Sequence, residues 1–158
     1  MYESPEPISD LGAPGSFDDS GVNPSCIVKN GDEKYLYYIG WQRCKRVPYM
    51  LFAGPAVNKG DNRFGFGRPR VIKEADKYSM WYSIRSRTEP YKIGYAESSD
   101  EINRIRKDDE AGIERSQTGW DSEMICCPCG GGANGKRFMF YNGNRHGSTG
   151  FGCAVSES

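Results

Sequence analysis

Two acidic side chains, Asp19 and Glu123, stand at the same spacing in two similar parts of the chain. Each lies five residues before a proline, Pro24 in one part and Pro128 in the other. If the two parts are copies of one structural unit, both carboxylates lie near a common opening. One carboxyl with a raised pKa and a second carboxylate, flanking one bond, is what acid and base cleavage of a glycosidic bond requires.

The spacing predicts Glu123 as the candidate catalytic acid and Asp19 as the candidate base. Asp121 and Asp18 are neighbours that could tune or replace them. The alternative is structural, because an aspartate in a turn can accept hydrogen bonds from its own backbone. A third similar part of the chain has Phe64 at the matching place, so only two of the three carry a carboxylate there.

Three polar side chains are candidates for binding a substrate. Arg68 directly precedes Pro69 and could bind a hydroxyl or carboxylate of a sugar, or it could be an ordinary surface arginine. Asn142 and Asn144 lie in a Tyr-Asn-Gly-Asn turn and offer amide donors and acceptors. Asn-Gly is also a preferred hairpin turn, which is the structural alternative for this pair.

Three aromatic side chains, Trp41, Trp120 and Tyr141, could stack on a pyranose ring, because the C–H faces of sugars pack against aromatic planes. The alternative is that these rings fill the core between sheets, as most aromatic residues of an all-β protein do.

Neither a metal nor another cofactor is expected from the cysteines. Of the six, Cys26 and Cys153 sit in apolar runs, where a free thiol behaves as a small hydrophobic group. The run from Cys126 to Cys129 is a cluster, but structural zinc usually needs two separated pairs of ligands. His146, the only histidine, is a poor complement to it.

These candidate residues are carried by a repeated pattern. In three segments a proline opens a short strand, a polar turn follows, and a lysine leads into an aromatic-rich strand. Each segment then has a Gly-x-Ala run, and in the first segment the middle residue of this run is Pro55. The aromatic pairs fall 12 to 14 residues after the proline, at Tyr37-Tyr38, Trp81-Tyr82 and Phe140-Tyr141.

The repeat predicts an all-β fold, a partial β-propeller of about three four-stranded antiparallel blades. The opening prolines are 45 and 59 residues apart, which is the size of a propeller blade. We expect a single domain over 1–158, with approximate blades at 17–60, 61–107 and 119–158. A meander or sandwich is the alternative. A helix fits only 100–114, which lacks an apolar stripe.

Several strings carry a resemblance to a known group of proteins, among them KYLYYIGW, YKIGYAESSD, GWDSEMICCP and FMFYNGNRHGSTGFGCAV. They resemble the five-bladed β-propeller proteins related to glycoside hydrolase families 43 and 32, over roughly residues 6 to 158. The resemblance implies glycosidase chemistry at Glu123 and Asp19.

The chain departs from that group in its number of units. A five-bladed ring needs five units, and this chain has three. The resemblance implies that an N-terminal blade is missing. It also implies that about one further blade has been lost between Asn58 and Phe64. It also implies that Glu101 and Arg104 replace a turn glycine and a strand tryptophan. Cys127 and Cys129 would stand where aromatic residues are expected.

Composition excludes several classes of partner. Lys plus Arg equals Asp plus Glu at 21 each, so no net charge attracts nucleic acid or an anionic membrane. No stretch approaches the ~20 apolar residues of a membrane span. The start MYESPEPISD does not read as a signal peptide, so we expect a cytoplasmic protein.

Two functions remain open from the sequence. One is a glycosidase-like enzyme that uses Glu123 and Asp19; the other is a non-catalytic glycan-binding or assembly module. In either case the expected partner is a carbohydrate. Three blades would leave sheet faces uncovered, so we also expect a homo-oligomer, most simply a dimer.

Overall fold

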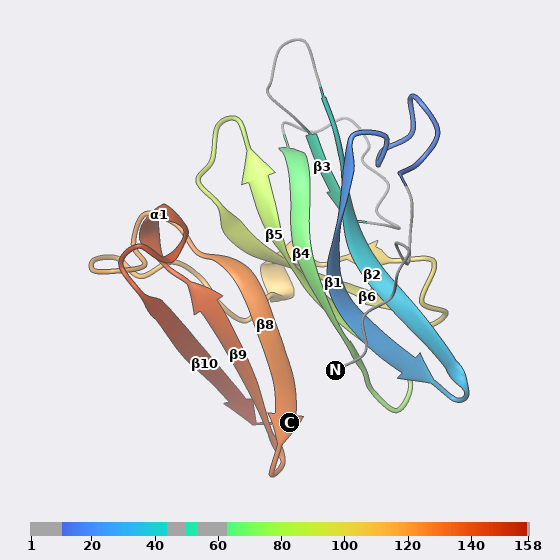
Figure 1. The fold of residues 1–158 in the computed structure, drawn as a ribbon. Coiled ribbons are helices and arrows are strands. Elements are labelled where there is room, and N and C mark those ends of the chain that lie inside the picture. The colour runs from blue at the N-terminus through green and yellow to red at the C-terminus, as the bar shows by residue number, and fades with distance from the viewer. Residues whose placement is uncertain (1–10, 44–49, 54–62, 158) are drawn as a thin grey trace, which may run out of the picture.

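The structure is a computed structural model that describes residues 11–43, 50–53 and 63–157. The described chain is almost entirely β, and its strands form three sheets that follow one another along the sequence (Figure 1). The third sheet stands apart from the first two in the ribbon, and a long connection after the second sheet leads to it.

The first sheet contains β1 (Gly21–Asn30), β2 (Glu33–Gln42) and the short β3 (Met50–Ala53). Strands β1 and β2 form an antiparallel hairpin whose tight turn contains Gly31, with a φ of +59°. Glycine adopts this left-handed conformation without the steric cost that a Cβ imposes. Strand β3 pairs antiparallel with β2.

The second sheet contains β4 (Arg63–Lys73), β5 (Tyr78–Ser86), β6 (Lys92–Ser98) and β7 (Ile105–Arg106), all antiparallel. One parallel residue pair, Leu51 with Gly65, joins β3 to β4, so the strand pairing of the first sheet continues into the second at this residue pair. A 3-10 turn, η1 (Asp108–Glu110), follows β7.

The third sheet contains β8 (Cys126–Ala133), β9 (Lys136–Asn142) and β10 (Phe151–Glu157), again antiparallel. The short turn α1 (Asn144–Gly147) connects β9 to β10. Its residues Arg145 and His146 have φ values of 53° and 57°, so it is a left-handed turn and not a regular helix.

The main core lies between the first two sheets. Alternation along β1 turns Cys26 and Val28 inward and leaves Ile27 64% exposed. Facing them are large side chains of the second sheet, including Val71, Met80, Phe66, Tyr82 and Ile84.

The predicted all-β fold with three antiparallel sheets is confirmed. The second sheet has the four strands expected of a blade, with the two-residue β7 paired to β6 as its outer strand. Within 100–114 the structure holds β7 and the single 3-10 turn in place of a helix. Cys26 and Cys153 are free thiols within strands, as predicted; Cys26 is buried in β1, whereas Cys153 is exposed on β10.

Glu101 and Arg104 occupy the positions implied for a turn glycine and a strand tryptophan. Glu101 has a φ of +67°, the left-handed conformation that favours glycine. The Arg104 guanidinium lies 5.2 Å from the ring centre of Tyr37 and donates a hydrogen bond of 2.6 Å to its hydroxyl. This arginine therefore links the second sheet to the first.

Candidate functional site

The three opening prolines, Pro24, Pro69 and Pro128, converge on one cavity. It has a volume of about 400 Å³ and is called the convergence cavity here. Besides the prolines, its walls are the residues that flank them and one apolar side chain of β2: Asn23, Ser25, Arg68, Arg70, Cys127, Cys129 and Ile39.

A β-bulge lies at each of these prolines. The register of β1 shifts between Pro24 and Cys26, that of β4 between Gly67 and Arg70, and that of β8 between Cys126 and Cys129. Proline has no N–H to donate to the ladder, and a bulge removes the need for that bond. The same break in each sheet turns the flanking side chains toward a common centre.

Two of the flanking residues have an unusual backbone. Arg68 has a φ of 49° and Cys127 a φ of 60°, and each directly precedes its proline. Few non-glycine residues adopt positive φ, and such strain is concentrated at functional sites, at roughly 1–3 kcal/mol per residue. The equivalent positions of two sheets therefore share one strained conformation at the cavity.

Hydrogen bonds across the sheets hold the cavity wall in place. The Ser25 hydroxyl donates to the carbonyl of Pro69 at 2.6 Å, and the Nε of Arg70 donates to the carbonyl of Gly130 at 2.6 Å. The backbone N–H of Cys127 donates to the Ser83 hydroxyl at 2.8 Å. All three sheets are thus joined at this point.

The convergence cavity is basic. Among its described lining residues Arg68 and Arg70 are cationic, and none is a carboxylate. The Arg68 side chain is exposed, and its guanidinium has no hydrogen-bond or ion-pair partner in the described part of the chain. A guanidinium presents a planar fork that matches a carboxylate or phosphate in two parallel hydrogen bonds.

Asp19, the predicted base, is used in a turn. Its carboxylate accepts hydrogen bonds from the backbone N–H of Gly15 and the hydroxyl of Ser20, both at 2.8 Å, and from the Gln42 amide at 3.4 Å. The Gly15 and Ser20 bonds hold the pKa of Asp19 below its ordinary value, so the group is ionised at neutral pH. It does not line the convergence cavity.

Glu123, the predicted acid, is exposed on the loop before β8. Its backbone N–H donates to Asn144 Oδ1 at 2.8 Å, and its carbonyl accepts a hydrogen bond of 3.2 Å from Arg115. It also lies outside the lining of the convergence cavity, so the catalytic assignment of Asp19 and Glu123 stays a prediction.

The predicted neighbours of that pair, Asp18 and Asp121, are the ones that correspond in the structure. Asp18 accepts a hydrogen bond of 2.9 Å from the Tyr38 hydroxyl, and Asp121 accepts one of 3.1 Å from the Tyr141 hydroxyl. Both aspartates are buried. The preceding ring packs on the same tyrosine in each case, Phe17 in the first sheet and Trp120 in the third.

The aromatic candidates pack within their own sheets. Trp120 stacks on Tyr141 with ring centres 5.5 Å apart and remains 36% exposed. Trp41 lies against Gly21, where an added Cβ would meet the indole at 2.0 Å. Neither tryptophan nor Tyr141 lines the convergence cavity.

The two asparagine candidates organise loops. Asn144 is buried; its Oδ1 accepts from the backbone N–H groups of Glu123 and Met124, and its Nδ2 donates to the carbonyl of Gly119 at 3.2 Å. The Asn142 amide donates to the carbonyl of His146 at 3.2 Å. Asn144 therefore fixes the loop that carries Glu123.

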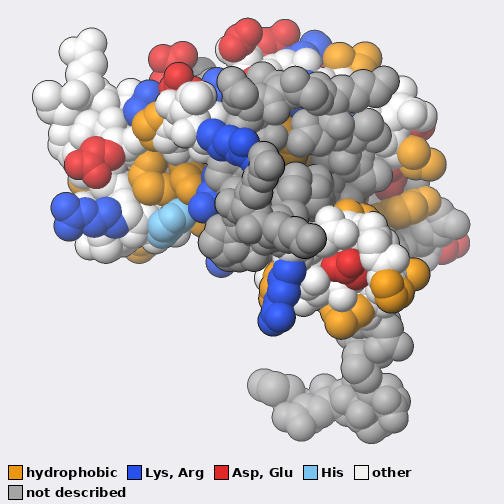
Figure 2. Space-filling view, turned by 90° about the horizontal axis from the view of Figure 1, so that it is seen from above, with side chains coloured by type: hydrophobic (Ala, Val, Ile, Leu, Met, Phe, Trp, Pro, Cys, Tyr) orange, Lys and Arg blue, Asp and Glu red, His pale blue; other side chains and the backbone are white. Residues whose placement is uncertain are grey.

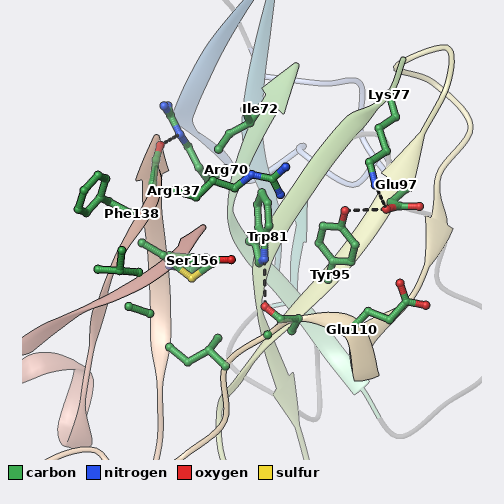
Figure 3. Close-up of a pocket in the computed structure, with 18 residues that line it drawn as sticks. Arg70, Ile72, Lys77, Trp81, Tyr95, Glu97, Glu110, Arg137, Phe138 and Ser156 are labelled. Atoms are coloured by element: carbon green, nitrogen blue, oxygen red, sulfur yellow. Dashed lines mark hydrogen bonds and ion pairs between the residues drawn. The ribbon is translucent and has the colours of Figure 1, made fainter. Parts of the chain in front are cut away.

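A second hollow of about 330 Å³, the inter-sheet groove, lies between the second and third sheets, with Trp81, Tyr95 and Glu97 among its lining (Figure 3). Glu97 accepts hydrogen bonds from Lys107 at 2.8 Å, from Lys77, and from the Tyr95 hydroxyl at 2.8 Å. These bonds lower the pKa of Glu97 to about 2. The carboxylate of Glu97 in the inter-sheet groove is thus already paired with neighbouring side chains.

Among the described residues no group of three or more His, Cys, Asp or Glu side chains is placed to hold a metal ion. The histidine side chain lies at the surface in the space-filling view, where it is pale blue (Figure 2). Over the same described residues, no helix has the length and apolar character needed to cross a membrane.

Sequence reasoning found Arg68 but missed the other polar residues of the convergence cavity, Asn23, Ser25 and Arg70. A signal for them was present, because each flanks one of the repeated prolines. Aligning the X-Pro-X triplets of the three units would have predicted every lining residue except Ile39.

A scan against protein families finds none that matches this chain. An uncharacterized protein found in two strains of Mycobacterium tuberculosis is 28% identical over 230 aligned residues, covering 97% of this chain and 77% of the relative. That span is longer than the 158 residues of this chain, so the alignment contains gaps in it. The blade loss predicted between Asn58 and Phe64 falls largely on 54–62, outside the described residues.

Two solved structures share the fold of this chain. One, named "Glycoside hydrolase", superposes with a TM-score of 0.68 over 96% of this chain and 50% of its own. The other, a complex of BT0996 with RGII, superposes with a TM-score of 0.65 over 90% of this chain and 47% of its own. Both are 16% identical to it, so the likeness is one of fold. The chain spans about half the length of each.

Proposed function

We propose that this chain is a carbohydrate-binding protein with a glycosidase-like fold, and that it binds an acidic sugar in the convergence cavity. The observation that carries the proposal is the pair Arg68 and Arg70 in a cavity of about 400 Å³ whose described lining contains no carboxylate. The carbohydrate class comes from the fold shared with a glycoside hydrolase.

The ligand chemistry follows from the side chains of the cavity. A uronate carries one carboxylate, which the Arg68 fork can bind through two charge-assisted hydrogen bonds. Asn23 and the backbone at the bulges offer further donors and acceptors for ring hydroxyls. A neutral sugar has no charge to pair with the guanidinium of Arg68.

Binding without hydrolysis is the function that the geometry favours. Glycoside hydrolysis needs two carboxyl groups that flank the bond to be cleaved. Asp19 is engaged in its turn and Asp121 is buried against Tyr141, so neither is oriented into the convergence cavity. Glu123 is the exposed carboxylate that keeps a hydrolase as the second candidate.

Calorimetry with a uronate oligosaccharide and its neutral counterpart tests this proposal. We expect the acidic ligand alone to bind, and Arg68→Gln to weaken binding by about 10- to 100-fold, the value of a lost charge-assisted contact. Arg87→Gln, on the exposed loop after β5, is the matched control and should bind normally. Equal binding of both sugars, or an equal loss in both variants, would contradict the site.

A panel of aryl glycosides separates binding from hydrolysis. We expect no turnover by the wild-type chain on substrates that include uronides. Turnover that Glu123→Gln abolishes would instead favour the hydrolase, with Glu123 as its acid.

We also propose that the protein acts as a homodimer. The outer face of the third sheet exposes Phe140, Phe151 and Val155, and the outer face of the first sheet exposes the cross-strand pair Ile27 and Leu36. Apolar faces of this kind are usually covered by a partner. Because one chain matches about half of a structural neighbour, a second copy is the occupant of the right size to complete the fold.

A further inference from the structure

Two adjacent cysteines of β8, Cys126 and Cys127, lie next to each other at the convergence cavity, and Cys127 is part of its wall. Their sulfur atoms are 3.5 Å apart, within hydrogen-bonding distance. Cys127 is half-buried and lines the cavity, whereas Cys126 is 1% exposed behind it. One thiol can therefore be reached from the cavity, and the second is in contact with the first.

The surroundings give the two thiols different acidities. The hydrogen bond shared with Cys126, the positive charge of Arg68 and a hydrogen bond with Asn142 lower the pKa of Cys127 to about 7, against the effect of burial. The neighbouring Cys127 and burial raise the pKa of Cys126. At neutral pH the accessible sulfur is thus partly a thiolate, and the buried one keeps its proton.

The backbone and a neighbouring imidazole complete the arrangement. Cys127 is held at a φ of 60° by the proline bulge and by the hydrogen bond from its N–H to Ser83. His146 Nδ1 lies 3.7 Å from Cys126 Sγ, and the imidazole packs edge-on against Tyr91. In the tautomer with its proton on Nε2, this exposed imidazole can accept the Cys126 proton and pass it to water.

We propose that Cys126 and Cys127 form a redox-active dithiol that opens onto the convergence cavity and is oxidised by low-molecular-weight disulfides. In the first step the Cys127 thiolate attacks one sulfur of the disulfide. The old S–S bond breaks, one thiolate leaves, and Cys127 carries a mixed disulfide.

In the second step Cys126 resolves this intermediate. Cys126 gives its proton to His146 or to the departing thiolate and attacks the Cys127 sulfur, and the second thiolate leaves. The two cysteines lose two electrons in total, and the external disulfide gains them as two thiols. The product is a disulfide between adjacent residues.

Adjacent Cα atoms are about 3.8 Å apart across a trans peptide. Most disulfides bridge Cα atoms about 4.4–6.8 Å apart. We therefore expect the product to be reduced readily by a monothiol, as a reversible site requires.

Mass spectrometry with oxidised glutathione as the probe tests the bond pattern. The full chain is oxidised at pH 7 in a Cys129→Ser background, which leaves only the two adjacent cysteines on that stretch of β8. We expect the peptide to lose two hydrogens. Adding Cys126→Ser should trap a glutathione adduct on Cys127, and adding Cys127→Ser should leave Cys126 unmodified. No oxidation, or an adduct confined to other cysteines, would overturn the proposal.

The chain with native Cys129 decides which thiol resolves the intermediate. We expect fragmentation to place the bond between Cys126 and Cys127. A bond from Cys127 to Cys129 would overturn the assignment of Cys126.

The pH dependence of alkylation by iodoacetamide tests the thiolate separately. A pKa of about 7 increases the thiolate fraction at pH 7 about 50-fold over a thiol of ordinary pKa 9.0. The lower nucleophilicity of a more acidic thiolate reduces this gain to about six-fold. We expect a rate midpoint near 7 that rises in Arg68→Gln and not in Arg87→Gln. A midpoint near 9 in the wild-type chain would refute the proposal.

Discussion

Replacing Arg68 by glycine and by alanine separates the backbone conformation of the convergence cavity from its charge. Both changes remove the guanidinium, so both should weaken binding of an acidic sugar by about 10- to 100-fold, as expected for Arg68→Gln. They differ in the backbone, because Arg68 has a φ of 49°. Alanine keeps the steric cost of a Cβ in the left-handed region, and glycine removes it.

The expected difference in stability is small but measurable. A left-handed backbone costs an L-residue roughly 1–2 kcal/mol. Glycine avoids this cost, but its greater conformational freedom in the unfolded chain destabilises the folded protein by about 0.5–1 kcal/mol relative to alanine. Arg68→Gly should therefore be more stable to unfolding than Arg68→Ala by about 0.5–1 kcal/mol. For a chain of 158 residues this corresponds to a rise in Tm of about 1–4 °C.

Urea unfolding followed by tyrosine and tryptophan fluorescence measures this difference. Lys34, exposed in β2 with an ordinary strand backbone, provides the control pair. There the glycine variant should be less stable than the alanine variant by about 0.5–1 kcal/mol. If glycine is the less stable replacement at both positions, the strained backbone at Arg68 is refuted, and with it the argument from strain to function.

Three further predictions concern the core, acid stability and assembly. Ile84→Ala, at a position 1% exposed, should reduce the free energy of unfolding by about 2–5 kcal/mol in a denaturant titration. Glu97 has a pKa lowered to about 2, so its contribution to stability is present above about pH 4.5 and is lost as pH falls toward 2; the Tm of Glu97→Gln should change less over that range. Phe151→Ser, at a residue that is 72% exposed, should convert the dimer to a monomer in light scattering at micromolar concentration; a wild-type monomer would contradict the proposed assembly.

The fold could be predicted because its signals are local and repeated. Proline, polar turn, lysine and paired aromatic residues recur in one order, and alternation within each strand marks a buried face. The left-handed backbone at Glu101 agrees with a glycine position inferred from the resemblance. These features depend on neighbours a few residues away, which the sequence displays directly.

The equivalence of the acidic residues could not be settled by counting. Spacing from the prolines paired Asp19 with Glu123, whereas the hydrogen bonds to Tyr38 and Tyr141 pair Asp18 with Asp121. In β1 the register shift skips one residue, Ser25, whereas in β8 it skips two, Cys127 and Pro128. A difference of one residue at a bulge is enough to change which side chains correspond.

Asp19 and Glu123 were thus the natural catalytic candidates from the sequence alone. The sequence by itself determined the strands, the repeats and the types of side chain that a site could contain. Only the tertiary structure decided that the X-Pro-X triplets meet, because their meeting depends on how three sheets pack and on bulges that turn side chains inward. It also set Arg68 beside Cys127, 59 residues away, where its charge stabilises a thiolate. Electrostatic effects of this kind depend on distance in space, which spacing along the chain does not contain.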